Sequence, residues 1–185
     1  MGPMDILMYE HRLIERMLKV LTVAAEHVKV EADGETFEKS IDFIRNFADK
    51  FHHAKEENEL FPLIERKGIA KEGGPIGMML QEHDVGRNYV KGMANSLRKY
   101  KTGDKSQTNI ISRNAMDYVN LLKEHIMKED NILYPMGNRV ISDQERSFLV
   151  QRFKEIDAKA DGGGVSEKYH NLVHELEKKF NISYK

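Results

Sequence analysis

Apolar residues recur every three or four positions along most of this chain, which is the spacing of one face of an α-helix. The strict alternation of apolar and polar residues that is typical of half-buried strands is essentially absent. Prolines are few and glycines are clustered, so long stretches rich in Leu, Met, Glu, Lys and Ala remain uninterrupted. The pattern predicts six helices, at about residues 4–32, 35–67, 75–102, 105–137, 142–160 and 165–180.

Four of the predicted helices are long and joined by short connections, as an up-down-up-down bundle requires. We therefore predict an all-α fold, a four-helix bundle with two additional C-terminal helices. Residues 1–140 are expected to form the bundle that holds a functional site, and residues 141–185 a helical extension packed on it. Ser142, followed three residues later by Glu145, predicts a capping box. The glycines at 162–164 predict the one flexible linker.

Two of the long helices end in the same polar motif. Residues 52–62 and residues 125–135 both match H-x-x-K-E-(E/D)-N-x-L-(F/Y)-P. A motif shared by two helices indicates a common, pseudo-symmetric task, and its polar residues are candidates for one site.

The helical advance of about 100° per residue gives the direction of each side chain relative to the apolar face. In the second predicted helix, His52 lies roughly 40° from the centre of that face and His53 roughly 140° from it. Glu56 lies at the inner edge, roughly 80° off, whereas Glu57 falls on the opposite side. We predict that His52 and Glu56 point inward and that His53 points outward.

The other three long helices also direct a histidine inward. His11 lies about 50° and His83 about 30° from the centre of the respective apolar face, and His125 and Glu129 lie almost at the centre of theirs. Asp130 is turned roughly 110° away. The predicted inward polar set is His11, His52, Glu56, His83, His125 and Glu129.

This inward set suggests a metal site. A single inward histidine is usually a hydrogen-bonded core residue, but one such histidine on each of four helices is harder to explain in that way. Two buried carboxylates need compensation, and no Lys or Arg occupies a matching inward position in the phase analysis. Two metal ions would compensate them, with imidazoles and bridging carboxylates as ligands.

Composition narrows the function further. The chain has 185 residues, enough for one domain, and its 30 acidic and 29 basic residues give no basic surface for nucleic acid. It contains no cysteine, so any metal must use nitrogen and oxygen ligands. No apolar run approaches the roughly 18 residues needed to span a bilayer, and the N-terminus lacks a signal-peptide core. We expect a soluble cytoplasmic protein without a nucleic-acid or membrane partner.

Other polar residues are weaker candidates. Glu15 could contact the site, although a solvated position at its edge is favoured. Tyr118 could form a hydrogen bond near the site or elsewhere in the core, and Arg87 could pair with a buried glutamate or lie exposed. His170 and His174 have the spacing of a metal pair, but neither faces a core, so surface positions are expected.

The motifs resemble those of the hemerythrin-like, or HHE cation-binding, proteins. The resemblance covers about residues 5–140, through E-H-R-L-I, F-H-H-A-K-E-E-N-E-L-F-P, E-H-D and E-H-I-M-K-E-D-N-I-L-Y-P. It implies a non-haem di-iron centre, oxo- or hydroxo-bridged. In that centre the four inward histidines are terminal ligands and Glu56 and Glu129 bridge the two Fe ions.

The chain departs from the oxygen-carrying hemerythrins at two points. Those proteins carry a second histidine one turn along the third helix, where this chain has Met79 and Arg87 around His83. They also use an aspartate that would correspond to Asp130, whereas phase and repeat both favour Glu129. The four-histidine, two-glutamate set looks more like di-iron proteins linked to repair of iron–sulfur clusters and like iron-sensing hemerythrin domains. The resemblance does not extend to the cysteine-bearing domain of the repair proteins, because the chain contains no cysteine.

Such a site would leave one open position on each iron, where O₂, NO, peroxide or azide would fit and a large organic substrate would not. The favoured hypothesis is a di-iron protein that binds or senses O₂ or NO, or handles iron, in a stress response. The first alternative is an oxidoreductase that reduces NO, O₂ or peroxide. The second is a structural helical bundle whose histidines bind zinc or nothing. Protein partners do not follow from the sequence.

Overall fold

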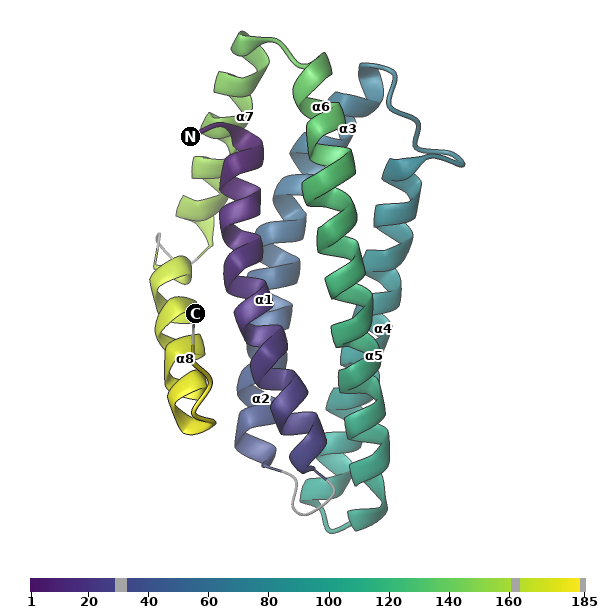
Figure 1. The fold of residues 1–185 in the computed structure, drawn as a ribbon, viewed down its shortest axis with the longest axis vertical. Coiled ribbons are helices and arrows are strands. Elements are labelled where there is room, and N and C mark those ends of the chain that lie inside the picture. Colours follow the sequence, from purple (N-terminus) through teal and green to yellow (C-terminus); the bar gives the residue numbers. More distant parts are fainter. Residues whose placement is uncertain (29–32, 161–163, 184–185) are drawn as a thin grey trace.

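The computed structural model describes residues 1–28, 33–160 and 164–183, and these residues form an all-helical structure without strands (Figure 1). The predicted all-α fold is confirmed. The elements are α1 (Pro3–His27), α2 (Gly34–Phe43), η1 (Ile44–His53), η2 (Glu56–Leu60), α3 (Phe61–Arg66), α4 (Pro75–Lys101), η3 (Lys105–Gln107), α5 (Thr108–Lys128), η4 (Glu129–Leu133), α6 (Tyr134–Val140), α7 (Asp143–Lys159) and α8 (Val165–Lys179).

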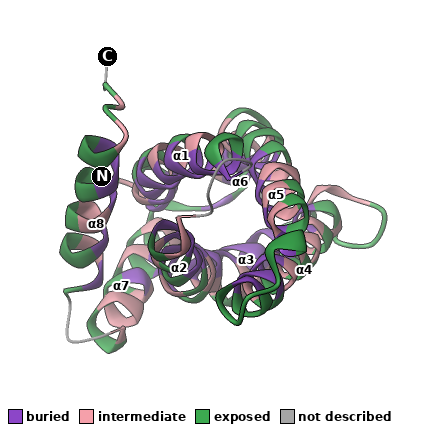
Figure 2. Ribbon diagram, turned by 90° about the horizontal axis from the view of Figure 1, so that it is seen from below, coloured by how far each residue is buried: buried purple, intermediate pink, exposed green. Residues whose placement is uncertain are grey.

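These elements build four antiparallel rods and two outer helices. The rods are α1, the run from α2 to α3, α4, and the run from α5 to α6, and they alternate in direction (Figure 1). Viewed along the bundle, the buried residues line the inside of the ring of rods, and α7 and α8 lie outside it (Figure 2). Both outer helices contact α1; α7 also contacts η2, and α8 also contacts α2 and η1.

The predicted boundaries hold with one exception. The first helix ends at His27, before the predicted limit at 32, and residues 29–32 lie outside the described residues. The predicted linker also falls mostly outside them, since only Gly164 of its three glycines is described, as the N-cap of α8. Ser142 and Glu145 form the predicted capping box at the start of α7. No helix in the described ranges is long and apolar enough to cross a membrane.

Two rods widen into π-helical turns just before a proline. The backbone N–H of Phe61 donates to the carbonyl of Glu56, five residues earlier, and that of Tyr134 donates likewise to Glu129. The next residue in each case is a proline, which has no N–H to donate and cannot extend an ordinary α-helical turn. A π-turn accommodates one extra residue and often occurs at functional sites. Both turns begin at the glutamates of the repeated motif.

A polar layer divides the interior of the bundle into two apolar clusters. One cluster runs from Leu13 and Phe37 to Leu176, and the other contains Met4, Leu60, Leu133 and their neighbours. The apolar clusters on both sides bury the residues of the layer between them, which the four rods contribute.

Replacing Ser142 by alanine should lower the free energy of unfolding by about 1 kcal/mol, because the Glu145 amide loses its capping acceptor. Ser147→Ala, on the exposed face of the same helix, is the control and should change stability by less than about 0.5 kcal/mol. Urea denaturation of both variants measures this difference, and equal effects would contradict the capping role.

Candidate metal centre

All six residues of the predicted inward set lie in the polar layer, and each is at most 2% exposed. They come from four rods: His11 from α1, His52 and Glu56 from η1 and η2, His83 from α4, and His125 and Glu129 from α5 and η4. Potential ligand atoms gather in two groups, each within 4.8 Å. One group is His11, His52, Glu56 and Glu129, and the other is His53, His83 and His125.

Each of the four inward imidazoles is oriented by a carboxylate from another rod. The Nδ1 atoms donate to Asp130 (2.7 Å from His11), Glu10 (2.9 Å from His52), Glu57 (2.7 Å from His83) and Glu82 (2.9 Å from His125). A carboxylate that accepts from Nδ1 fixes the tautomer and leaves the Nε2 lone pair free to bind a metal. All four Nε2 atoms therefore face the centre of the layer as potential ligands.

A cation in turn holds each of these carboxylates. The pairs are Arg12 with Asp130, Lys55 with Glu10, Arg87 with Glu57, and Lys128 with Glu82. The arrangement repeats with pseudo-twofold symmetry. Glu10 and Glu82 each directly precede the histidine of their own rod, and they orient His52 and His125 of the next rod. Glu57 and Asp130 each directly follow a central glutamate, and they orient His83 and His11.

The two central carboxylates lie between histidines of different groups. Glu129 Oε2 lies 3.3 Å from His11 Nε2 and 3.2 Å from His125 Nε2. Glu56 Oε2 lies 3.6 Å from the Nε2 atoms of both His52 and His83. This is the placement that carboxylates bridging two metal ions would have.

The unpaired atoms of the layer fit metal ions. Glu56 Oε2 and both carboxylate oxygens of Glu129 are buried without a hydrogen-bond partner among the described residues. His83 Nε2 and His125 Nε2 face each other at 3.1 Å although both Nδ1 atoms already donate, so a proton or a metal cation must lie between them. Two nitrogens bound at right angles to one metal, each at about 2.1 Å, would be about 3.0 Å apart.

Without metal, protons must balance these charges. Burial opposes a proton on His125, but Glu129 and Glu82 outweigh it and raise the pKa of His125 to about 9. The pKa of His11 is also raised, because Asp130 and Glu129 outweigh its burial. Burial and the neighbouring Glu129 hold the pKa of Glu56 well above its usual value. Metal ions would replace these protons.

The prediction that His53 points outward is wrong. His53 is buried, and its ring stacks on that of His83 with centroids 3.7 Å apart and planes 14° apart. The reason is that η1 is π-helical. A π-helix has more residues per turn, so each residue rotates the side-chain direction by a smaller angle than an α-helix does. Because an imidazole binds metal in its own ring plane, an ion in the plane of His83 would lie well outside the plane of His53. The stacked rings therefore do not share one ion as they are placed here.

The prediction that no lysine points inward is wrong for Lys55. The side chain is fully buried and lies over the Phe51 ring, 3.8 Å from its centroid. Its amine pairs with Glu10 and, at 2.6 Å, with Asp157 of α7 rather than with the central glutamates. Lys55 thus connects the C-terminal extension to the carboxylate that orients His52.

The weaker candidates have mixed outcomes. Glu15 does not enter the polar layer; its partly exposed side chain pairs with Arg12. Arg87 pairs with Asp49, Glu57 and Asp84 and not with the central glutamates. Tyr118 is buried, and its hydroxyl has no hydrogen-bond partner in the described chain. Of the two C-terminal histidines, His174 is exposed and His170 is partly buried beside Tyr9, so neither enters the polar layer.

Sequence reasoning missed the carboxylates and cations that orient the histidines. Glu57 and Asp130 were assigned outward directions, yet both reach back to a histidine of another rod. The signal was present in the repeat, because the lysine and the second acid of H-x-x-K-E-(E/D) recur together with the ligand candidates. The pairs Glu10-His11 and Glu82-His83 recur as well.

Replacing Lys55 by methionine should cost about 3–5 kcal/mol of stability in the metal-free protein, because it leaves Glu10 buried without its cation. Lys128→Met is the matched control from the repeat; its side chain is 23% exposed, and the loss should stay within about 1 kcal/mol. Burial raises the pKa of Glu10 to about 7 even with Lys55 present, so the cost at Lys55 should be larger at pH 8 than at pH 5.5. Urea denaturation at the two pH values tests this, and similar costs for both lysines would refute it.

Comparisons with known proteins agree with the chemistry of this layer. The chain is 20% identical over 178 residues to an uncharacterized protein, Rv1995, of Mycobacterium tuberculosis, covering 95% of this chain and 69% of that one. It is 30% identical over 133 residues to the iron-sulfur cluster repair protein YtfE of Edwardsiella ictaluri, an alignment that covers 68% of this chain and 59% of that protein. It is 25% identical over 135 residues to YtfE of Escherichia coli, with 70% of this chain and 61% of that protein covered. No solved structure matches. The sequence profile of the hemerythrin HHE cation-binding domain matches residues 2–137, and the chain belongs to that family.

Proposed function

We propose that this protein binds two iron ions in the polar layer and that the loaded site binds a small molecule such as O₂ or NO. The proposed ligands are His11, His52, Glu56, His83, His125 and Glu129. The observation that carries the proposal is the convergence of four Nε2 atoms on two buried carboxylates whose inner oxygens have no other partner in the described residues.

The residues of the chain would hold and orient the ligand atoms. The four carboxylates that accept from Nδ1 keep each imidazole in one tautomer and one ring orientation. The Tyr134 hydroxyl donates to Glu56 Oε1 at 2.5 Å, which leaves Oε2 as the oxygen free for metal. Apolar clusters lie on both sides of the layer. Bound iron would supply redox-dependent affinity for a diatomic ligand.

The donor set fits a pair of iron ions. Imidazole and carboxylate ligands suit iron, and two bridging carboxylates suit a pair of ions better than one tetrahedral zinc. In a purely structural layer, protons alone would have to compensate the buried carboxylates. Turnover of NO, O₂ or peroxide is the second candidate, favoured by the similarity to relatives named as iron–sulfur cluster repair proteins. Steady consumption of NO or peroxide in the presence of a reductant would identify turnover. Reversible binding without consumption would identify a binding function.

Glu56→Gln gives a test in which the effects on metal and on stability have opposite signs. The variant should lose at least one of the two irons per chain after anaerobic reconstitution, together with the ferric absorption bands of the wild type. The metal-free variant should be more stable than the metal-free wild type at pH 7.5, because ionising Glu56 in the folded state is unfavourable. That gain should shrink as the pH falls toward 4.5, where the unfolded carboxyl also binds its proton.

Iron analysis, optical spectra and urea denaturation at several pH values provide the measurements. Ser40→Ala, at a buried hydroxyl outside the layer, is the control and should retain both irons. Absence of iron from the reconstituted wild type would overturn the proposal. Full iron in Glu56→Gln would remove Glu56 from the proposed ligands.

A further inference from the structure

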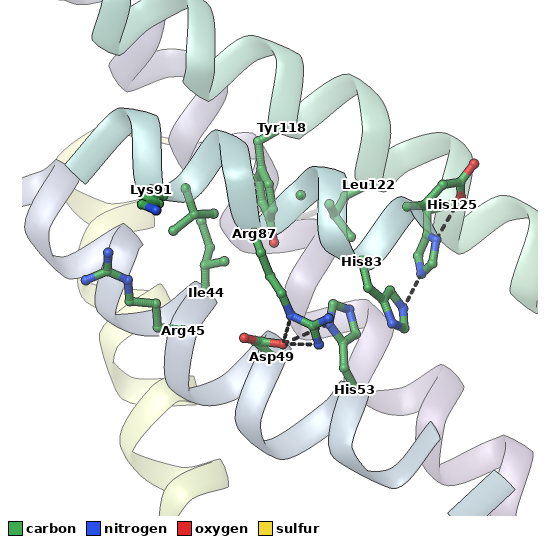
Figure 3. A pocket seen from close by; sticks show the side chains of 13 residues that line it. Ile44, Arg45, Asp49, His53, His83, Arg87, Lys91, Tyr118, Leu122 and His125 are labelled. Carbon is green, nitrogen blue, oxygen red and sulfur yellow. Dashed lines mark hydrogen bonds and ion pairs between the residues drawn. The ribbon is translucent and has the colours of Figure 1, made fainter. Parts of the chain in front are cut away.

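A cavity of about 110 Å³ lies on one side of the polar layer, between η1, α4 and α5 (Figure 3). Its inner end is formed by His53, His83 and His125, and its walls include Gly86 and Tyr118. A water molecule occupies about 30 Å³ in the liquid, so the space accommodates a molecule of two or three heavy atoms and excludes an organic substrate. The cavity reaches two of the proposed metal ligands.

Two buried polar groups in the cavity wall make no hydrogen bond in the described part of the chain. One is the Tyr118 hydroxyl, which has no hydrogen-bond partner there; the other is His53 Nδ1, which makes no hydrogen bond but lies 3.5 Å from Asp49 in an ion pair. Both side chains are at least nine-tenths buried. Figure 3 shows the Tyr118 hydroxyl pointing toward Arg87 and His53. A buried hydroxyl without a partner is unfavourable, and a polar molecule in the cavity would give it one.

The pseudo-symmetric repeat shows that this space is specific to one half of the site. Three residues after His83 is Gly86, whereas three residues after His11 is Ile14. His53 follows His52, whereas Ile126 follows His125. Ile14 and Ile126 are both buried core residues, so bulky apolar side chains fill the positions that correspond to the cavity wall. The His11 and His52 half therefore lacks the glycine and the histidine that shape the cavity.

The outer end of the cavity is basic. Arg45 and Lys91 line it with exposed side chains, and Arg87 lies between them and the histidines, paired with Asp49 at 2.7 Å. Positive charge at the mouth of a narrow cavity attracts small anions. Arg87, at the position one turn after His83, donates to both Asp49 and Glu57.

We propose that this cavity is the binding chamber for a small anionic or diatomic ligand, which reaches the proposed di-iron site from the side of His83 and His125. Gly86 provides the space, the Tyr118 hydroxyl provides a hydrogen-bonding group, and His53 forms part of the inner wall. The inference rests on the proposed function, since it needs a loaded site.

Azide binding to the iron-reconstituted protein tests the chamber, with the affinity read from an optical titration. Gly86→Leu should keep two irons per chain and lower azide affinity by at least about tenfold, because its side chain fills the cavity beside Tyr118. Gly92→Leu is the control on α4; it is not among the residues that line the cavity. Its Cβ would collide with Asn114 Oδ1 and push that side chain aside, and it should leave the affinity unchanged.

A graded series guards against failure of the large variant to fold. A Cβ at residue 86 would meet Tyr118 and Leu122 at ordinary contact distances of 3.5 and 3.7 Å, so Gly86→Ala and Gly86→Val should fold. Azide affinity should fall progressively from glycine to alanine to valine. Wild-type azide affinity throughout the series, with two irons retained, would overturn the chamber and leave the proposed function standing. Absence of iron from the wild type would overturn both.

Xenon pressurisation of metal-free crystals gives a readout that does not depend on iron. Xenon should occupy the cavity beside Gly86 in the wild type and be excluded from it in Gly86→Leu. Xenon absent from this position in the wild type would overturn the chamber.

Discussion

The structure depends on the burial of two carboxylates among four imidazoles whose Nε2 atoms all face the same interior layer. Such a layer is unfavourable in an apolar bundle unless cations or protons neutralise it. In the metal-free protein the pKa values of His125, His11 and Glu56 are all raised, so protons supply that neutralisation. A site that holds protons in place of metal is ready to exchange them for metal as the pH rises.

A chain of charges extends from this layer to the surface in four directions. Each histidine is oriented by a carboxylate, and each carboxylate is paired with an arginine or lysine. Three of these cations are partly exposed, whereas Lys55 is fully buried and is shared with Asp157 of α7. The C-terminal extension therefore participates in positioning His52, which gives it a role beyond covering the bundle. We propose that residues 141–185 act as part of the site's support and not as an independent unit.

The sequence was sufficient to predict the fold and the burial of six polar residues, because both follow from helical periodicity and a repeated motif. It was insufficient for His53, since the phase calculation assumes α-helical geometry and η1 is π-helical. The prolines that end both repeats are a sequence signal of the π-helical turns that precede them, but they do not show how far the π-helix extends. Lys55, Glu57 and Asp130 were missed for another reason. Side chains at the edge of a helix face can contact a neighbouring rod, and a calculation on one isolated helix does not contain that rod.

Iron-edge anomalous diffraction from crystals of the reconstituted protein locates the ions without assuming their ligands. We expect two anomalous peaks inside the bundle, one beside the Nε2 atoms of His11 and His52 and one beside those of His83 and His125. Both peaks should lie within bonding distance of Glu56 and Glu129. A single peak at the surface, or no peak in the polar layer, would contradict this expectation.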